Sequence, residues 1–448
     1  MKDIKNKVID FLKRHGMDHE DIDIDENCRI FLDEMQRGLA GQKSSLAMLP
    51  TYIETQREIP LNKPVIVMDA GGTNFRVATV YFNNDKKPVI CKENGEPLGE
   101  KEKLQTYEMP GVRQEVSKEK FFRIMAGYVK NVIAKSEHIG FCFSYPIEIF
   151  PNKDGRVSHF SKEIQAKEVV GEMIGENLNR AIATLGQGSK KQIVLLNDTV
   201  TALLAGRSSF PDRTFDSYIG FILGTGTNCS YIEQNINITK TKGLDPAKSQ
   251  IVNVESGGFA KAPQGTIDQR FDASSMSPGT YTFEKMISGA YLGPLCLKVI
   301  QVAAEDGLFS DTSAQKLKNI NQISTKEVSD FMCYLMSNAN ALSCAIDSAT
   351  EDDAMTLYYL LDRLIERAAK LTAINLSSVA IKSGKGQNPC RPVCIVAEGT
   401  TFYHLKSLKQ KVEYYLKQYL QNQKNIHYEI VGVENATLIG AAIAGLTN

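Results

Sequence analysis

The sequence predicts an α/β protein in which one strand–turn–strand unit occurs twice. The first turn spans residues 69–74, with the sequence DAGGTN, and the second spans residues 223–228, with the sequence LGTGTN. Apolar, β-branched runs precede and follow both turns, which predicts a strand on either side of each turn. Further predicted strands alternate with helices, a pattern typical of sheets that carry helices. Because an internal repeat reports architecture, we expect duplicated sheets.

The other elements are predicted, in order, from the spacing of apolar residues. Residues 5–14 carry four large apolar residues at helical spacing and are predicted to form an amphipathic surface helix. A membrane-anchoring helix is the alternative, but the segment is short and lacks a strongly basic face. Residues 28–38 repeat the helical spacing, and the first hairpin follows at 64–82.

Beyond the first hairpin, short β-branched runs predict strands, and longer runs with apolar residues every three or four positions predict helices. The predicted strands are 89–91, 139–143, 192–196, the second hairpin 218–232, 251–254, 393–396 and 428–431. The predicted helices or helix-rich stretches are 118–133, 163–185, 200–205, 281–304, 326–376 and 436–446.

Length and charge limit the classes of function. At 448 residues the chain is long enough for two or three domains. Lysine plus arginine and aspartate plus glutamate both number 52, so no bulk charge favours nucleic acid or an anionic membrane, and neither is an expected partner. The N-terminus does not resemble a secretory leader and the nine cysteines are scattered, which favours a cytoplasmic location. No apolar run reaches the roughly 20 residues that cross a bilayer.

The paired turns are predicted to hold phosphate groups. Glycine lets a backbone approach a phosphate, and threonine hydroxyls and backbone N–H groups donate to it. For a bound triphosphate, Asp69 is the candidate carboxylate for Mg²⁺, which prefers oxygen ligands and keeps several waters. Asp198 is the candidate general base, and Lys162 could offset charge on the transferring phosphoryl group. Because an aspartate at a helix start is often only a cap, both interpretations of Asp198 stay open.

Other carboxylates and amides suit a substrate with several hydroxyl groups. Glu255, Glu284, Asn197 and Asn228 can each bind hydroxyls. A buried polar group left unpaired by the wrong substrate costs roughly 1 to 3 kcal/mol. Such a ring of groups would therefore discriminate substrates by their hydroxyl pattern.

Six longer motifs resemble those of the hexokinases, a family of the sugar kinase, heat-shock protein 70 and actin superfamily. They are FLDEM…MLPTY within 31–52, DAGGTNFR at 69–76, GFCFSYP at 140–146, LNDTV at 196–200, GTGTN at 224–228 and FEKMISG at 283–289. The resemblance runs from about residue 28 to the C-terminus. It implies a two-lobed actin-like ATPase (ribonuclease H-like) fold, with duplicated mixed sheets and a cleft between the lobes. It also implies ATP and Mg²⁺ as cofactors and a hexose as the small-molecule partner.

The resemblance also implies roles for single residues. The implied sugar ligands are Ser144, Ser161, Lys162, Asn197, Asp198, Asn228, Glu255 and Glu284. Asp198 resembles the base for the 6-hydroxyl, with Lys162 as the second catalytic residue. The implied ATP-binding residues are Asp69, Gly71, Gly72, Thr73, Asn74, Arg76, Gly224, Thr225, Gly226, Gly399 and Thr400. Asp69 is the implied magnesium ligand, through water.

The chain departs from the family pattern around the implied pocket. It contains no tryptophan, and Phe160 and Ser256 stand where the family often has one. Glu398 replaces the usual aspartate of the adenosine motif, and residues 435–440 lack the usual serine and basic residue. These differences alter the pocket walls and bear on the preferred sugar and phosphoryl donor.

The predicted activity is ATP-dependent phosphorylation of a hexose at its 6-hydroxyl, with glucose first and mannose second, as a step that feeds glycolysis. A kinase for fructose or an amino sugar is one alternative. A non-catalytic sugar sensor is another, but a sensor would be expected to lose Asp198 or the turns, and here both are intact. An actin-like structural protein is the last alternative, but it would not need sugar ligands at Lys162, Glu255 and Glu284.

The chain is predicted to divide into two domains that share the sequence discontinuously. Residues 1–63 and 198–432 would form a large hexokinase domain, and residues 64–197 and 433–448 a small one. We expect a monomer or a homodimer.

Overall fold

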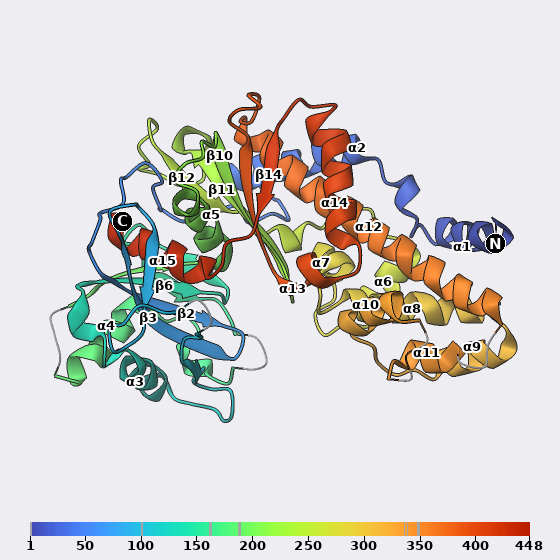
Figure 1. Ribbon diagram of the computed structural model, residues 1–448, viewed down its shortest axis with the longest axis horizontal. Helices are drawn as coiled ribbons and strands as arrows, with labels where there is room; N and C mark the ends of the chain where they lie inside the picture. Colours follow the sequence, from blue (N-terminus) through green and yellow to red (C-terminus); the bar gives the residue numbers. More distant parts are fainter. Residues whose placement is uncertain are drawn as a thin grey trace.

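Two mixed β-sheets of matching topology form the centre of the protein in a computed structural model (Figure 1). The structure describes residues 2–99, 102–160, 164–186, 190–335, 337, 339–346 and 350–448. The first sheet has the strand order β4-β3-β2-β6-β9, with β5 added beside β3, and the second has the order β1-β12-β11-β10-β13-β14. In both, an antiparallel meander of three strands is extended by two parallel strands. The predicted duplication of mixed sheets is confirmed.

The strands of each sheet have the following bounds. The first sheet contains β2 (Val65–Gly71), β3 (Asn74–Phe82), β4 (Pro88–Cys91), β5 (Thr106–Glu108), β6 (His138–Phe143) and β9 (Gln192–Leu196). The second contains β1 (Leu49–Pro50), β10 (Ser217–Leu223), β11 (Thr227–Gln234), β12 (Ser249–Asn253), β13 (Val393–Glu398) and β14 (Tyr428–Val431). A separate hairpin joins β7 (Ile147–Ile149) and β8 (Gly155–Val157).

The helices are distributed as follows. Those before the second sheet are α1 (Lys2–Arg14), α2 (Ile24–Leu39), α3 (Lys118–Val129), α4 (Ile174–Thr184) and α5 (Asp198–Ser209). Those that follow β12 are α6 (Thr266–Ala273), α7 (Thr282–Ile287), α8 (Leu292–Glu305), α9 (Asp311–Lys318), α10 (Thr325–Cys333), α11 (Ala341–Ile346) and α12 (Glu351–Ser383). After β13 come α13 (Thr400–His404) and α14 (Leu408–Leu416), and α15 (Ala436–Thr447) ends the chain.

Helices and sheets alternate in layers. On the first sheet, α3 and α4 enclose one apolar cluster, while α2, α7 and the long helix α12 pack against the second sheet in another (Figure 1). The middle layer, formed by α5 and α15, shares a third cluster with strands of both sheets. Helix α15 is buried almost all round, which explains why its sequence is apolar on every face rather than along one stripe.

The two middle helices exchange partners between the sheets. Helix α5 follows β9 of the first sheet but packs on β10 and β13 of the second. Helix α15 follows β14 of the second sheet but packs on β2 and β6 of the first. The two helices also cross each other, so any change in their contact alters the relation between the two sheets.

Two glycines make this close packing possible. A Cβ atom at Gly140 in β6 would lie 1.8 Å from the carbonyl oxygen of Ala441 in α15. A Cβ atom at Gly440 in α15 would lie 2.0 Å from the carbonyl oxygen of Thr201 in α5. Both contacts are with backbone, so no side-chain movement could relieve them. The sheet–helix–helix spacing in the middle layer therefore requires glycine at both positions.

The predicted helix at residues 163–185 is wrong in its first half. Within the described part of this stretch, the helix α4 begins only at Ile174, after a 3-10 turn at Lys167–Val169. The backbone of Gln165 instead bonds to Gly111 and Val116 in the manner of a strand, with N–O distances of 2.8 and 2.9 Å. Long-range pairing therefore overrides the helical spacing of the apolar residues.

The predicted N-terminal amphipathic helix is confirmed as α1. Val8, Phe11 and Leu12 are each 0% exposed and belong to the cluster that also contains residues of α12. The apolar face is thus covered by protein. Among the described residues, no helix has both the length and the apolar character required to cross a bilayer.

Candidate active site

Helix α5 brings Asn197 and Asp198 to the edge of the first sheet, directly after β9. Asn197 is the N-cap. Its Oδ1 accepts hydrogen bonds from the backbone N–H of Thr199 at 3.0 Å and from the Thr199 hydroxyl at 2.7 Å. The Asp198 carboxylate accepts the same N–H at 2.8 Å. Because Asn197 already caps the helix, capping alone does not account for an aspartate at position 198.

The environment of Asp198 favours its protonated form. Burial, with smaller contributions from the charges of Glu255 and Asp69, raises the pKa of this carboxyl to about 7. A general base works best when its pKa lies near the operating pH, because it is then both partly ionised and basic enough to take up a proton. Asp198 therefore has the electrostatics expected of a general base.

The first turn places a partly buried ion pair in the cavity that Asp198 also lines. Asp69 in β2 lies opposite Arg76 in β3, and the Nε of Arg76 donates to Asp69 Oδ2 at 3.0 Å. Thr437, in the first turn of α15, donates to the same oxygen at 3.1 Å and accepts from Arg76 Nη2 at 3.0 Å. The start of α15 thus belongs to this site, which sequence reasoning missed. The sequence pointed to Thr437 only through its place in residues 435–440, the segment that lacks the family's usual serine and basic residue.

The second turn meets two other segments. The carbonyl oxygen of Gly224 accepts the N–H of Gly289 at 2.7 Å and the hydroxyl of Thr401 at 2.9 Å. Gly399 has a φ of +114°, and a Cβ atom there would lie 2.3 Å from the carbonyl oxygen of Leu223. Only glycine fits these two conditions, so the segment 399–401 sits directly against the second turn.

A group of amides and carboxylates lies behind the second turn. The amide of Asn228 donates to Asn253 at 2.8 Å and to Glu255 at 3.2 Å, and Asn253 donates to Glu255 at 2.7 Å. Glu284 accepts the backbone N–H of Thr227 at 2.9 Å. Sequence reasoning missed Asn253. Its position two residues before Glu255 in the sequence was the signal that could have identified it.

Burial also shifts the two glutamates of this group. It raises the pKa of Glu284 to about 7, and the charge of Glu255 contributes to that rise. The pKa of Glu255 is raised mainly by burial, while the amides of Asn253 and Asn228 partly offset the effect. Buried carboxylates of this kind are poised to accept hydrogen bonds from a substrate's hydroxyls.

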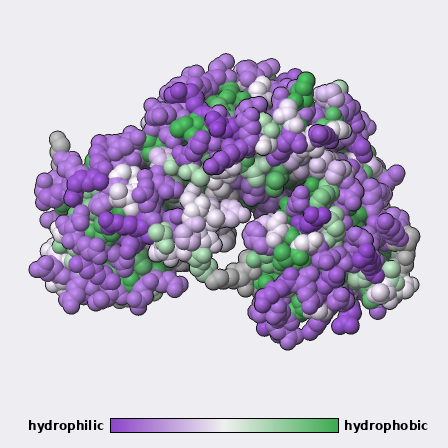
Figure 2. Space-filling model, turned by 180° about the vertical axis from the view of Figure 1, so that it is seen from behind, coloured by the Kyte–Doolittle hydropathy of each residue, from purple (hydrophilic) through white to green (hydrophobic). Residues whose placement is uncertain are grey.

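A cavity of about 550 Å³ joins parts of both sheets. It is lined by Asp69, Gly71, Asn74, Arg76, Thr106, Ser144, Asp198, Ile222, Glu398, Gly399 and Thr437. The space-filling view from behind shows a recess between the two halves of the molecule (Figure 2). The structure therefore gathers at one place residues from the first turn, from the end of β6, from α5 and from the ends of β10 and β13.

The other predicted site residues are placed as follows. The segments that contain Gly72, Thr73, Asn197, Gly224, Thr225, Gly226 and Thr400 adjoin the cavity-lining residues along the chain or across a strand pair. Asn228, Glu255 and Glu284 form the polar group behind the second turn. Ser161 and Lys162 lie outside the described residues.

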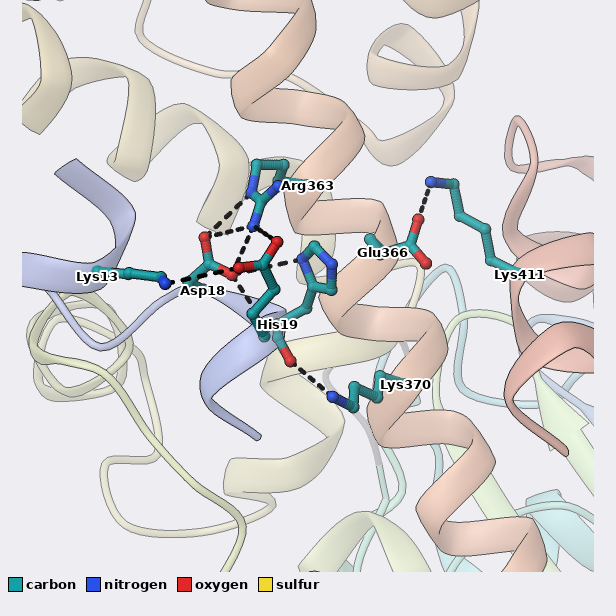
Figure 3. A network of polar contacts seen from close by, with 8 residues as sticks. Lys13, Asp18, His19, Arg363, Glu366, Lys370 and Lys411 are labelled. Atoms are coloured by element: carbon teal, nitrogen blue, oxygen red, sulfur yellow. Dashed lines mark hydrogen bonds and ion pairs between the residues drawn. The ribbon is translucent and has the colours of Figure 1, made fainter. Parts of the chain in front are cut away.

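A second polar network lies where the N-terminal segment meets α12 (Figure 3). Asp18, His19 and Glu20 have ligand atoms close enough to hold a metal ion. However, Arg363 donates to both oxygens of Asp18 at 2.7 Å and pairs with Glu20 at 3.0 Å. Burial, followed by the charge of Arg363, lowers the pKa of His19. Arg363 and Lys13 already pair with these carboxylates, so the network docks the N-terminal segment on α12.

Comparison with known proteins agrees with this geometry. Two family models described as hexokinase match residues 8–208 and 218–447. "Hexokinase-1" of Arabidopsis thaliana is 27% identical over 435 residues, which cover 92% of this chain and 85% of that protein. "Hexokinase-7" of Oryza sativa subsp. japonica is 27% identical over 434 residues, which cover 92% of this chain and 90% of that protein.

A solved structure shares the fold. A hexokinase from Schistosoma mansoni, complexed with glucose, superposes with a TM-score of 0.77 at 22% identity, with 99% of each chain covered. This match confirms the predicted two-lobed actin-like ATPase fold. Since one family model alone matches residues 218–447, more than half of the sequence, and the second matches most of the remainder, the chain belongs to the hexokinase family.

Proposed function

We propose that this protein transfers the γ-phosphoryl group of ATP to the 6-hydroxyl of a hexose, with glucose preferred and mannose second. The observation that carries the proposal is the position of Asp198. Its carboxylate lines the cavity and is influenced electrostatically by Asp69 on the side of the first turn and by Glu255 on the side of the polar group. A proton acceptor between a phosphate site and a hydroxyl-binding site is what hydroxyl phosphorylation requires.

In the proposed reaction, Asp198 accepts the proton of the 6-hydroxyl as that oxygen bonds to the γ-phosphorus. The bond between the γ-phosphorus and the bridging oxygen breaks, and ADP leaves with the electron pair. Asn228, Glu255 and Glu284 would hold hydroxyls at other positions of the sugar. Lys162, as a predicted second catalytic residue, would offset charge on the transferring group.

The residues of the cavity fit a bound magnesium ion. Three carboxylates, from Asp69, Asp198 and Glu398, line it together with the guanidinium of Arg76. Hard oxygen donors of this kind suit Mg²⁺. Asp69 would hold the ion through water, and the ion would supply positive charge that stabilises the transferring phosphoryl group. We place the reaction in the cytoplasm, as a step that feeds glycolysis.

A coupled assay of ADP formation tests the proposed function. We expect turnover with glucose and, at lower kcat/KM, with mannose, because both carry a free 6-hydroxyl. Fructose and glucosamine are the comparison substrates. Glucose 6-phosphate should be identified directly as the product. Absence of turnover with both glucose and mannose, in protein that binds ATP, would contradict the proposal.

Thr437 provides a separate test of the ATP side of the site. Replacing Thr437 with valine removes the hydroxyl that links Asp69 to Arg76. We expect KM for ATP to rise about fivefold, since a hydrogen bond to a charged group contributes about 1 kcal/mol or more, with KM for glucose nearly unchanged. Thr447→Val is the matched control, because that hydroxyl lies at the other end of α15, where it donates to the carbonyl of Ile443 at 2.7 Å and accepts from Asn448 at 2.8 Å. An equal change in both variants would exclude a specific role.

A further inference from the structure

Glu255, one of the carboxylates proposed to hold a sugar hydroxyl, has an unusual backbone conformation. It lies two residues beyond the end of β12, in the left-handed region, with φ of 58° and ψ of 48°. Few residues other than glycine, asparagine and aspartate adopt this conformation, and it persists where the surroundings determine it. The contacts of the next residue, Ser256, therefore bear directly on where the Glu255 carboxylate is held.

Ser256 is held by two amide side chains. Its backbone N–H donates to Oδ1 of Asn228 at 3.2 Å, and its hydroxyl accepts from Nδ2 of Asn375 at 3.2 Å. Ser256 is 0% exposed, so water does not compete for these bonds. Asn228 belongs to β11 and Asn375 to α12. The residue that follows Glu255 is thus fixed both to the sheet and to the long helix.

The amide of Asn375 also contacts the strand that carries Asn228. Its Oδ1 accepts from Sγ of Cys229 at 3.5 Å. The backbone N–H of Cys229 in turn donates to Oδ1 of Asn228 at 2.7 Å. Asn375 and Cys229 are each 0% exposed. One buried amide therefore bonds to the immediate neighbours, along the chain, of both Asn228 and Glu255.

These bonds hold two segments at one spacing. The amino group and the carbonyl of Asn375 each have a protein partner, one on the turn after β12 and one on β11. If the two segments moved apart, buried polar groups would lose their partners, which is unfavourable. The bond from Asn228 to Glu255, at 3.2 Å, spans the same two segments. Asn375 thus stabilises the arrangement in which those two side chains meet.

We propose that Asn375 is a positioning residue for sugar binding, which fixes Asn228 and Glu255 in the geometry that receives the sugar's hydroxyls. The inference rests on the proposed hexose phosphorylation, in which these two side chains hold hydroxyls. Ser256 completes the link, and it stands where the family often has a tryptophan. An indole N–H donates but cannot accept the bond from Asn375. The link is therefore a property of this chain's own sequence.

Two variants break the link from opposite ends. Ser256→Ala removes the hydroxyl that accepts from Asn375, and Asn375→Leu replaces the amide with an apolar group of similar size. The double variant completes a thermodynamic cycle. Ser378→Ala is the matched control, because Ser378 of α12 is also 0% exposed but donates to the carbonyl of Ile374, at 2.7 Å. For each protein, kcat, KM for glucose and for ATP, the glucose dissociation constant by calorimetry, and thermal unfolding are measured.

We expect Ser256→Ala and Asn375→Leu each to raise KM and the dissociation constant for glucose about fivefold, the size of effect that one hydrogen bond has on an equilibrium. The hydroxyls are held in the ground state and in the transition state alike, so kcat should change little. KM for ATP should also change little. The double variant should bind glucose no more weakly than Asn375→Leu, because both changes remove the same bond.

Ser378→Ala should bind glucose like the wild type, even where its melting temperature falls. An unchanged glucose dissociation constant in folded Ser256→Ala would overturn the proposal. Single effects that multiply in the double variant would also overturn it, because the two residues would then act independently. If Asn375→Leu does not fold, Ser256→Ala alone decides.

The same measurements separate this inference from the proposed function. If the wild type binds glucose without phosphorylating it, the proposed function fails, and the glucose dissociation constants still test Asn375. If turnover with glucose is normal but glucose binding does not change in the variants, only the inference about Asn375 fails. If the wild type binds no hexose, both are contradicted.

Discussion

Replacing Asp198 with asparagine is expected to lower kcat by about 10² to 10⁴, because the 6-hydroxyl loses its proton acceptor. The amide keeps the size and hydrogen-bonding capacity of the side chain, so the dissociation constant for glucose should change little. Steady-state kinetics and calorimetry on the same preparation measure the two quantities. A variant that retains most of the wild-type kcat would show that another group accepts the proton.

The same substitution is expected to stabilise the protein at high pH. The folded-state pKa of Asp198 is about 7, above its ordinary value of 3.8, so between these values the folded state keeps a proton that the unfolded state releases. The contribution of Asp198 to the unfolding free energy therefore falls as pH rises from about 4 to about 7 and is constant above that. Removing the charge should raise stability most at pH 8, less at pH 5 and least below pH 4.

Denaturant unfolding at pH 8 and pH 5 measures this difference. The gain at pH 8 should be on the order of 2 to 4 kcal/mol at most, since one pKa unit corresponds to about 1.4 kcal/mol. The control is Asp212→Asn, because Asp212 is exposed and its substitution should change the unfolding free energy little. A stability difference that does not depend on pH would contradict the raised pKa of Asp198.

Substituting alanine for Gly140 or Gly440 is expected to disturb both the fold and the activity. Each new Cβ atom would lie within 2.0 Å of a backbone oxygen in the middle layer, so a helix must move. Overpacking of this kind costs about 1 to 3 kcal/mol, and occasionally more. Because the Thr201 hydroxyl donates to the carbonyl of Asp198 at 2.6 Å, displacing α5 at Thr201 should also lower kcat.

Gly127 provides the matched control for these substitutions. It lies within α3, and a Cβ atom there would meet nothing within 4 Å. Gly127→Ala should therefore be neutral or stabilising by up to about 1 kcal/mol, because alanine is the better helix former. Thermal and denaturant unfolding compare the three variants. Equal stability of all three would show that the middle layer relaxes around the added methyl groups without loss.

The elements that sequence analysis identified correctly depend on residues close together in the chain. The spacing of apolar residues and the glycine-rich turns are local signals, and they predict the two hairpins, the short strands between them and α15. The prediction of a helix over residues 163–185 was wrong in its first half because contacts distant in the sequence act there. There, pairing with Gly111 and Val116, about 50 positions earlier, decides the backbone conformation of Gln165.

The candidate site divides in the same way. Asp69, Asp198, Glu255 and Glu284 could be named from motifs, because their residue types and neighbours are fixed by the sequence. The shifted pKa values of Asp198, Glu255 and Glu284 could not, since burial and neighbouring charge exist only in the folded protein. Asn253 is an intermediate case. Its place two residues before Glu255 could be seen in the sequence, but its hydrogen bonds to Asn228 and Glu255 could not.

By itself, the sequence determined the repeated turns, the alternation of strands and helices, and the acidic and amide residues that suit phosphate and sugar chemistry. The tertiary structure alone decided that α5 and α15 exchange sheets, that Thr437 reaches Asp69 from 368 positions away and that Asn228 and Asn253 both donate to Glu255. The reason is physical: periodicity and turn chemistry act over a few residues, whereas burial, electrostatic coupling and close backbone contact arise only when distant segments pack together.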